Sequence, residues 1–298
     1  MALLSKRFLP ASTRLWHCSL AVRNLNSLNR GTLSQPPLFI RVMDYQGYDR
    51  DFNLTNKVAL ITGGAAGIGK AIATLYALKG ASLILADLSP AVHDAAKQIV
   101  HDPARIEAVI GDITIAADRE RIVQTGVKKF GKIDILVNNA GVALLEPALD
   151  VSESNWDKTL DLNLKAAFFL SQLVAKEMIR TGGGKIVNIG SQAGMIALER
   201  HVAYMASKAA IIGITKVLAV EWAKHNVQVN AISPTVTLTE LGKKAWAGEV
   251  GEEFKRKLPA GRFADPDEIA ACALFLASEA TNMITGSNLV IDGGYTIQ

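Results

Sequence analysis

The chain has few cysteines and no long apolar run. Cys18 and Cys272 are the two cysteines among its 298 residues, and Cys18 lies in a leader segment. The folded body therefore has no intramolecular disulfide and no thiolate metal cluster, and we predict no metal site. No uninterrupted apolar stretch reaches the ~18 residues that a membrane-spanning helix needs, so we expect no integral membrane association.

Acidic residues are absent from residues 1–43, which contain six Lys or Arg side chains. The whole chain has 32 basic and 28 acidic residues, so 26 basic and 28 acidic side chains remain in residues 44–298, a net charge of −2. This balance lacks the basic excess with which proteins bind nucleic acid, and no nucleic-acid partner is expected. With 49% apolar residues, the body has ample material for a buried core.

The leader has the composition of a targeting peptide. Its basic residues interrupt every apolar run, which excludes the continuous apolar core of a secretory signal. An acid-free, Arg-rich segment is typical of an organelle address. We predict that residues 1–43 are a mitochondrial presequence and that residues 44–298 form a single domain. A plastid address and a simple extension on a cytoplasmic protein are the alternatives.

From residue 57 onward, short β-branched runs alternate with longer helical patterns, which is the signature of repeated βαβ units. Strands are predicted at 58–62, 82–86, 106–110, 133–137, 186–189, 227–232 and 288–291. Helices are predicted at 67–79, 90–100, 152–180 and 202–224, with another that ends at residue 130. The alternation predicts an α/β fold, a single doubly wound Rossmann domain in which helices cover both faces of a seven-stranded parallel sheet.

The turn after the first predicted strand is rich in glycine. It reads TGGAAGIG from Thr62 to Gly69, between a buried strand and a helix. Glycines let the backbone turn sharply and let a pyrophosphate approach the N–H groups at the positive end of the helix. We therefore predict that Gly63, Gly67, Ile68 and Gly69 bind a dinucleotide.

An acidic residue, Asp87, ends the second predicted strand, about twenty residues after the glycine turn. A carboxylate at this place accepts hydrogen bonds from the ribose hydroxyls of adenosine and repels a 2′-phosphate. Its neighbours Leu88 and Ser89 are not basic, and neither are Ala65 and Ala66 in the turn. The sequence therefore predicts NAD as the cofactor in preference to NADP.

Three further motifs follow in order along the chain. Asn138 to Gly141 reads NNAG after the fourth predicted strand, Ser191 follows the fifth, and Tyr204 lies thirteen residues beyond that serine. Lys208 is four residues after Tyr204, so the two side chains share one helical face. With the glycine turn, these motifs resemble a short-chain dehydrogenase/reductase of the classical type, over residues 53–295.

The resemblance implies a catalytic set. Tyr204 matches the general acid and base, and Lys208 matches the residue that lowers the tyrosine pKa and holds the nicotinamide ribose. Ser191 matches the hydroxyl that orients and polarises the substrate carbonyl, and Asn163 matches the asparagine that supports a water-linked proton relay. The pairing makes chemical sense, because tyrosine with its ordinary pKa near 10 is a poor base at neutral pH.

The resemblance also implies cofactor contacts beyond the glycine turn and Asp87. Asp112 matches an adenine contact, and Asn139 and Gly141 match residues that line the cleft. After the sixth predicted strand the family has Pro-Gly, whereas this chain has SPTVTLT. That departure leaves the carboxamide of the nicotinamide to the Thr235 and Val236 backbone and to the Thr237 hydroxyl.

Residues 230–246 resemble the carbonyl/L-xylulose reductase and polyol dehydrogenase branch of the family. Gln192 and His201 fit that branch, since each buried substrate hydroxyl needs a polar partner. Together with Ser191 and Tyr204 they are the predicted substrate contacts, and Trp246 is expected to close over the substrate from a lid at about 235–258. Alternatively, Gln192 caps a turn, His201 starts a helix and Trp246 only packs.

These features predict an NAD-linked enzyme that interconverts a sugar alcohol and its ketose, a small-molecule substrate. The alternatives are a 3-oxoacyl carrier-protein reductase, a 3-hydroxyacyl or hydroxysteroid dehydrogenase, and a non-catalytic scaffold that senses the cofactor. The scaffold is disfavoured because the chain retains the whole catalytic set. Pairing of the helices at 152–180 and 202–224 with symmetry mates, as is common in the family, predicts a homodimer or homotetramer.

Overall fold

The computed structural model describes residues 51–298, so the predicted presequence lies outside the described residues. Seven parallel strands form one sheet in the order β3-β2-β1-β4-β5-β6-β7. The strands are β1 (Val58–Thr62), β2 (Ser82–Asp87), β3 (Ile106–Ile110), β4 (Ile135–Asn138), β5 (Gly184–Ile189), β6 (Val227–Pro234) and β7 (Asn288–Ile291). The order reverses between β1 and β4, which is where doubly wound sheets bind their ligands. The predicted fold is confirmed.

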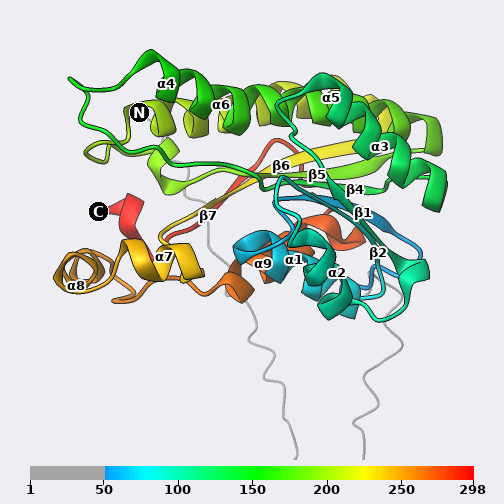
Figure 1. The fold of residues 1–298 in the computed structure, drawn as a ribbon, viewed down its shortest axis with the longest axis horizontal. Helices are drawn as coiled ribbons and strands as arrows, with labels where there is room; N and C mark the ends of the chain where they lie inside the picture. Colours follow the sequence, from blue (N-terminus) through cyan, green and yellow to red (C-terminus); the bar gives the residue numbers. More distant parts are fainter. Residues whose placement is uncertain (1–50) are drawn as a thin grey trace, which may run out of the picture. The chain divides into compact units, whose positions relative to one another are not determined.

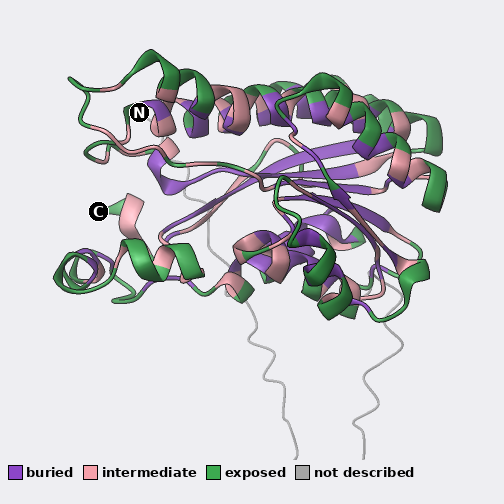
Figure 2. Ribbon diagram, viewed as in Figure 1, coloured by how far each residue is buried: buried purple, intermediate pink, exposed green. Residues whose placement is uncertain are grey.

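Helices cover both faces of the sheet, α1, α2 and α9 on one and α3, α5 and α6 on the other (Figure 1). The helices are α1 (Gly67–Leu78), α2 (Val92–Ile99), α3 (Ala116–Phe130), α4 (Glu153–Leu160), α5 (Ala167–Thr181), α6 (Val202–Trp222), α7 (Glu240–Ala245), α8 (Glu249–Arg256) and α9 (Pro266–Ala277). Because both faces are covered, β1 and β4 are buried along their whole lengths (Figure 2). Such strands read as continuous apolar runs, and this made them predictable.

The helix predicted at 152–180 is three pieces. Ser152 caps α4, its Oγ accepting a hydrogen bond from the Asn155 N–H at 3.2 Å. A π-helical turn over Asp161–Ala166 then separates α4 from α5. Periodicity in the sequence does not reveal one extra residue in a turn, and π turns are frequent at functional sites. Asn163 lies in this turn.

The predicted lid region contains α7 and α8, which the sequence did not indicate as helices. They pack around a cluster of Phe254, Leu258 and Phe263, apart from the main core. Trp246 lies in this cluster, with ring centroids 4.8 Å from Phe254 and 5.9 Å from Phe263. The ring packing holds α7 and α8 together, so the region folds on a small core of its own.

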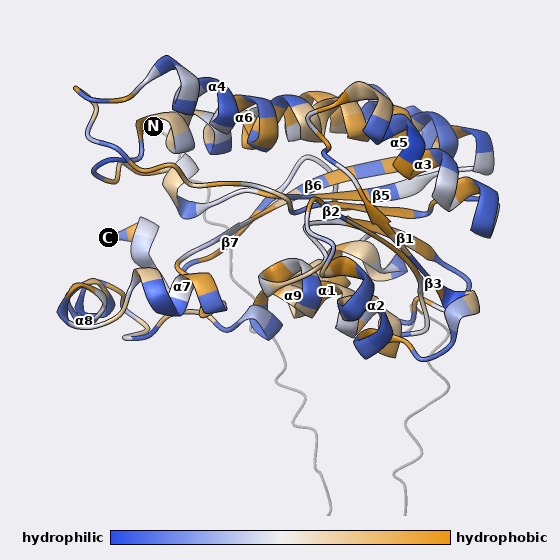
Figure 3. Ribbon diagram, in the orientation of Figure 1, coloured by the Kyte–Doolittle hydropathy of each residue, from blue (hydrophilic) through white to orange (hydrophobic). Residues whose placement is uncertain are grey.

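The helix Val202–His225 is long and apolar enough to cross a membrane by length and composition. In the fold it is α6 with its short continuation, and it packs against β6 and α4 (Figure 3). Its inner face buries Ser207, Lys208 and Thr215. A core helix meets the same compositional test, and 39% of the apolar window of α6 is buried in the fold.

Candidate active site

Tyr204 and Lys208 lie one turn apart near the start of α6. The Lys208 Nζ lies 5.7 Å from the centroid of the Tyr204 ring and donates a hydrogen bond to the carbonyl oxygen of Ile189, the last residue of β5, at 2.7 Å. Lys208 is 5% exposed. The strand end thus fixes the ammonium beside the tyrosine, as the i, i+4 spacing predicted.

Burial shifts both ionisable groups of this pair toward their neutral forms. It lowers the pKa of Lys208 to about 8. It raises the pKa of Tyr204, and a hydrogen bond from Ser191 offsets part of that rise. In the protein alone, therefore, desolvation and not Lys208 dominates the pKa of the tyrosine, and the phenol keeps its proton at neutral pH.

Ser191 follows β5 and is buried. Its Oγ accepts a hydrogen bond from the Ala193 N–H at 3.1 Å, so it caps the short 3-10 turn Gln192–Gly194. The same hydroxyl contacts Tyr204. A backbone-anchored serine beside a tyrosine gives two hydroxyl groups that converge on one place, as polarisation of a carbonyl oxygen requires.

Asn163 holds the site together from the π-helical turn. Its Oδ1 accepts from the Val142 N–H at 2.8 Å, and its Nδ2 donates to the Val142 carbonyl at 2.9 Å and to the Ser207 Oγ at 3.1 Å. The Ser207 hydroxyl in turn donates to the Tyr204 carbonyl at 2.7 Å. Ser207 was missed in the sequence, although its place three residues after Tyr204 on one helical face was a usable signal. The proton-relay role of Asn163 stays a prediction.

A cavity of about 670 Å³ opens at the carboxyl ends of β1 to β4. The predicted cofactor residues Gly63, Asp87, Asp112 and Gly141 line it. A Cβ at Gly141 would lie 3.0 Å from the Asn163 Oδ1 and 3.7 Å from the Lys208 Nζ. Gly141, which lines the cleft, therefore lies next to the catalytic lysine, and a side chain at this glycine would crowd Asn163.

The glycine turn is held by Asn139 from the neighbouring strand end. Its Nδ2 donates to the carbonyls of Thr62 at 2.9 Å and Gly63 at 3.2 Å, and a Cβ on Gly63 would lie 2.7 Å from that nitrogen. Gly63 and Gly67 also have φ of +66° and +55°, which favours glycine. Ile68 and Gly69 start α1, so the turn aims the helix N-terminus at the cleft.

Asp87 lies at the mouth of the cleft with its carboxylate fixed. Its Oδ2 accepts from the Ala65 N–H at 3.0 Å and its Oδ1 from the Ser89 N–H at 2.9 Å. Asp112, on the loop after β3, accepts from the N–H and hydroxyl of Thr114 at 2.8 and 2.7 Å. Both carboxylates line the same cavity, where they suit the ribose and adenine of a dinucleotide.

The segment after β6 places Thr235, Val236 and Thr237 beyond the sheet edge. Thr235 is buried, and its Oγ1 has no hydrogen-bond partner within residues 51–298. The Thr237 hydroxyl donates to the Thr235 carbonyl at 3.1 Å. A buried hydroxyl without a partner is costly, so Thr235 fits a polar group supplied by a ligand such as the nicotinamide carboxamide.

The predicted substrate residues separate into two groups. Gln192 is 2% exposed, and its Oε1 lacks a hydrogen-bond partner in the described part of the chain. The His201 ring lies 5.9 Å from the Tyr204 ring, and its Nδ1 lies 2.6 Å from the Glu199 carbonyl. These two residues adjoin the catalytic serine and tyrosine. Trp246 instead packs in the aromatic cluster under α8, and its substrate contact stays a prediction.

A buried polar chain behind the site was not anticipated. The Asn138 Nδ2 donates to the Ser171 Oγ and to the Asn188 Oδ1, both at 2.8 Å. The Asn188 Nδ2 in turn donates a hydrogen bond to the Thr215 Oγ1 at 3.0 Å. This chain ties β4, β5 and α6 together and so fixes the helix that carries Tyr204 and Lys208.

Comparison with known proteins identifies the family. A family model described as enoyl-(acyl carrier protein) reductase matches residues 63–296. An NAD-dependent glycerol dehydrogenase of Listeria innocua is 59% identical over 256 residues, which cover 86% of this chain and 100% of that protein. The chain belongs to the short-chain dehydrogenase/reductase family. This member is an oxidoreductase that acts on CH–OH groups with a nicotinamide cofactor, as predicted.

Two further likenesses extend the comparison for this short-chain dehydrogenase/reductase. A D-threitol dehydrogenase of Mycolicibacterium smegmatis is 52% identical over 84% of this chain and 96% of that protein. A crystal structure described as a putative NAD(P)-dependent gluconate 5-dehydrogenase of Beutenbergia cavernae, with NADP bound at low occupancy, has a TM-score of 0.79 and 35% identity. It covers 83% of this chain and 100% of that one.

The prediction of a mitochondrial location was wrong. The glycerol and threitol dehydrogenases that the chain resembles are bacterial proteins, and bacteria have no mitochondria. The prediction relied on the composition of residues 1–43 alone, and nothing in the comparisons supports a transit peptide there. Composition without a matched sequence was too weak a basis for an organelle address.

Proposed function

We propose that this short-chain dehydrogenase/reductase is an NAD-linked dehydrogenase of small polyols, which it interconverts with the corresponding ketoses. The observation that carries the proposal is the grouping of Ser191, Tyr204 and Lys208 just after β5 and near the start of α6, together with a cleft at the carboxyl ends of β1 to β4 that Asp87 lines. The names of the glycerol and threitol dehydrogenases support a polyol substrate of three or four carbons. An L-xylulose reductase type of activity on five-carbon substrates is the finer alternative.

The roles of the catalytic residues follow from their geometry. Tyr204 gives its phenolic proton to the carbonyl oxygen in reduction and takes the alcohol proton in oxidation. Ser191 donates a hydrogen bond to the same oxygen and so polarises the carbonyl. Lys208, fixed by the Ile189 carbonyl, supplies a positive charge that favours the phenolate. When bound, the cofactor supplies the hydride or accepts it.

The cofactor preference rests on Asp87. Both of its carboxylate oxygens are fixed by backbone N–H groups, so the charge cannot swing away from the ribose position. A 2′-phosphate there would meet a negative charge, whereas ribose hydroxyls would donate hydrogen bonds to it. NAD is therefore the expected cofactor.

The polyol assignment rests on two polar side chains beside the catalytic set. The buried Gln192 Oε1 lacks a partner, and a substrate hydroxyl would supply the missing donor. His201 adds a second polar group close to Tyr204. An acyl chain or a steroid would leave the Gln192 Oε1 without a partner, which disfavours the hydroxyacyl and hydroxysteroid alternatives. A carrier-protein reductase that uses NADPH is disfavoured by Asp87.

We also propose that the protein forms a homodimer or a homotetramer. On the two helices expected to pair, Val217 of α6 is 55% exposed and Phe169 of α5 is 38% exposed. Phe168 and Leu173 pack against the core instead. Analytical ultracentrifugation of the wild type and of Val217→Glu separates an interface role from chance exposure, since a charge in an interface dissociates the oligomer.

The decisive experiment follows NADH formation by the purified full-length chain. Glycerol, D-threitol and xylitol form the polyol arm of the panel, and a 3-hydroxyacyl thioester and a hydroxysteroid form the other arm. The panel is run with NAD and again with NADP, with Tyr204→Phe as the matched inactive variant. Turnover of a polyol with NAD is expected. Turnover of the thioester or the steroid alone would refute the polyol class in favour of that substrate. No turnover of any substrate would favour the non-catalytic scaffold.

A further inference from the structure

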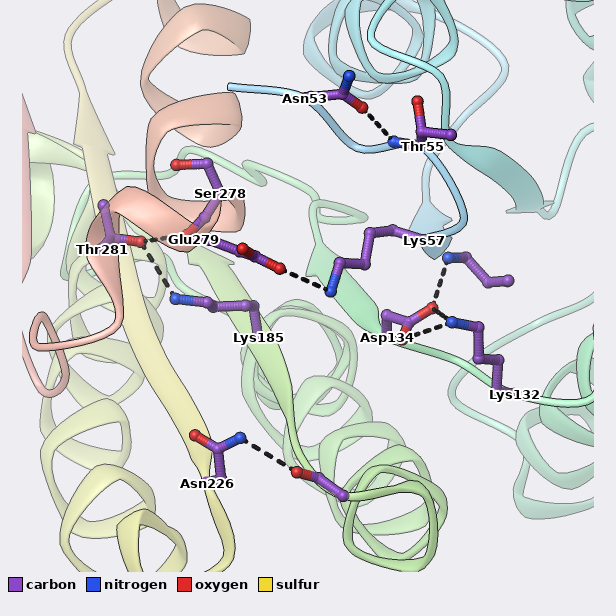
Figure 4. A network of polar contacts seen from close by, with 12 residues as sticks. Asn53, Thr55, Lys57, Lys132, Asp134, Lys185, Asn226, Ser278, Glu279 and Thr281 are labelled. Atoms are coloured by element: carbon purple, nitrogen blue, oxygen red, sulfur yellow. Dashed lines mark hydrogen bonds and ion pairs between the residues drawn. The ribbon is translucent and has the colours of Figure 1, made fainter. Parts of the chain in front are cut away.

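A second buried lysine lies at the other end of β5 from the catalytic site. Lys185 is the second residue of β5 and is 8% exposed, yet no step of the reaction uses it. Its side chain reaches the amino edge of the sheet, beside the 3-10 turn Glu279–Thr281 that follows α9 (Figure 4). A buried cation away from the catalytic site needs its own explanation.

Within the described part of the chain, the Lys185 ammonium has one hydrogen-bond acceptor. Its Nζ donates to the Thr281 Oγ1 at 3.3 Å, a long contact. Within residues 51–298 no carboxylate lies within ion-pair distance of this nitrogen. Glu279 pairs with Lys57 at 3.3 Å, and Asp134 pairs with Lys132 at 3.0 Å (Figure 4). The nearby acids therefore have other cations as partners.

The charged groups around Lys185 come from three elements. Lys57 precedes β1, Asp134 and Lys132 precede β4, and Glu279 follows α9. The pKa of Lys185 is lowered to about 8: burial is the main cause, Glu279 opposes it, and Lys57 adds a smaller effect in the same direction as burial. Much more of this amine is neutral at physiological pH than of an ordinary lysine, whose pKa is near 10.4.

A polar cavity of about 210 Å³ adjoins the amine. Its lining includes Thr181, Asn226, Gln228 and Gly182 to Gly184. A Cβ on Gly183 would lie 2.5 Å from the Asn226 Nδ2, so this close approach requires glycine. The lining carries Lys57 and Lys185 as well as Asp134 and Glu279, so its charges balance, and its hydroxyl and amide side chains suit a neutral ligand that carries several hydroxyls.

We propose that Lys185 is a nucleophilic modification site that forms an imine with small polyhydroxylated aldehydes and ketones. The lone pair of the neutral Nζ attacks the carbonyl carbon to form a C–N bond, while the nitrogen loses one proton and the carbonyl oxygen gains one. The resulting hydroxyl then takes up a second proton and leaves as water, and the nitrogen loses its remaining proton, which gives C=N. Nothing is oxidised or reduced in this condensation. The proposal does not depend on the polyol dehydrogenase activity, because it needs neither cofactor nor turnover.

Reductive trapping tests the site. The full-length chain is incubated without NAD at pH 7.5 with dihydroxyacetone and cyanoborohydride, and the rate of labelling at each lysine is measured by peptide mass spectrometry. Lys185 is expected to be labelled roughly ten times faster than the exposed Lys97, because a larger fraction of its amine is neutral. Lys185→Arg, which keeps the positive charge, should remove this fast label, while the control Lys97→Arg should leave it unchanged.

Two further measurements distinguish a reactive amine from a merely buried one. Glu279→Gln removes the charge that favours the ammonium, so labelling of Lys185 should accelerate at neutral pH. The labelling rate of Lys185 should level off above about pH 8, because most of its amine is then neutral. Labelling of Lys185 no faster than Lys97, or a rate that Glu279→Gln leaves unchanged, would overturn the proposal. If Lys185 is labelled fast but the chain oxidises no polyol, the imine proposal stands and only the proposed dehydrogenase function is refuted.

Discussion

The two edges of the sheet each hold a buried lysine near β5, and the two lysines have different surroundings. At the carboxyl edge, Lys208 donates to the Ile189 carbonyl at 2.7 Å and faces the Tyr204 ring. At the amino edge, Lys185 donates to a threonine hydroxyl at 3.3 Å beside a polar cavity. Burial lowers both pKa values to about 8. A perturbed pKa thus marks a buried amine, and only its neighbours show what the amine does.

The largest expected effect is at the carboxyl edge. Tyr204→Phe removes the group that exchanges the proton with substrate, so kcat should fall by roughly 1000-fold. The ring, and with it the packing against His201, is retained. NADH affinity, measured by fluorescence titration, should stay close to that of the wild type. Turnover near the wild-type value would refute the role of Tyr204.

Ser191→Ala should slow turnover by about 100-fold, because it removes a hydrogen-bond donor to the reacting oxygen. It should also change the pH profile. Ser191 lowers the pKa of Tyr204, so without it the phenolate forms only at higher pH and the oxidation rate should rise at a more alkaline pH. Initial rates from pH 6 to 10 measure the shift. A profile that moves to lower pH would contradict this account of the tyrosine.

Asp87→Asn should change the cofactor preference without touching the chemistry. Loss of the negative charge should reduce the ratio of kcat/KM for NAD to that for NADP by roughly tenfold, since the repulsion of the 2′-phosphate is removed. Asp112→Asn is the matched control, because that residue is expected to contact adenine. A ratio that moves equally in both variants would show that Asp87 does not select the cofactor.

The smallest expected effect is at the amino edge. A lysine with a lowered pKa in the fold binds fewer protons than in the unfolded chain between about pH 8 and pH 10.5, so its burial destabilises the fold below pH 8. Lys185→Met should therefore raise the free energy of unfolding by about 1 kcal/mol at pH 7, after allowance for solvent screening. The gain should vanish above about pH 10.5. Urea denaturation at both pH values tests it.

Much of the fold was readable because the central strands β1, β4 and β6 are continuous buried runs. β1 and β3 have the predicted bounds, as do Gly67 and Val202, the first residues of α1 and α6. The π-helical turn, α7 and α8 were missed, because their formation depends on tertiary packing such as the contacts of Phe254 and Phe263. β6 also runs two residues further than predicted, to Pro234, since its pairing with β7 continues there.

The site was predictable where motif and geometry coincide. Tyr204 and Lys208 share a helical face, and the structure brings Ser191 to them. Ser207 and the Asn138–Asn188 chain were not found, because their partners lie far away in sequence and only the sheet brings them together. Nothing in the sequence indicated that Lys185 is buried, since a lysine near the start of a strand is ordinarily expected to be exposed to solvent.

The comparison between the two lysines has one direct test. Lys208→Met and Lys185→Met remove the same amine from the two edges, and kcat for glycerol oxidation with NAD is measured for both beside the wild type. The account predicts a fall of about 100-fold or more for Lys208→Met and a value within about twofold of wild type for Lys185→Met. Equal losses in the two variants, or full activity without Lys208, would contradict it.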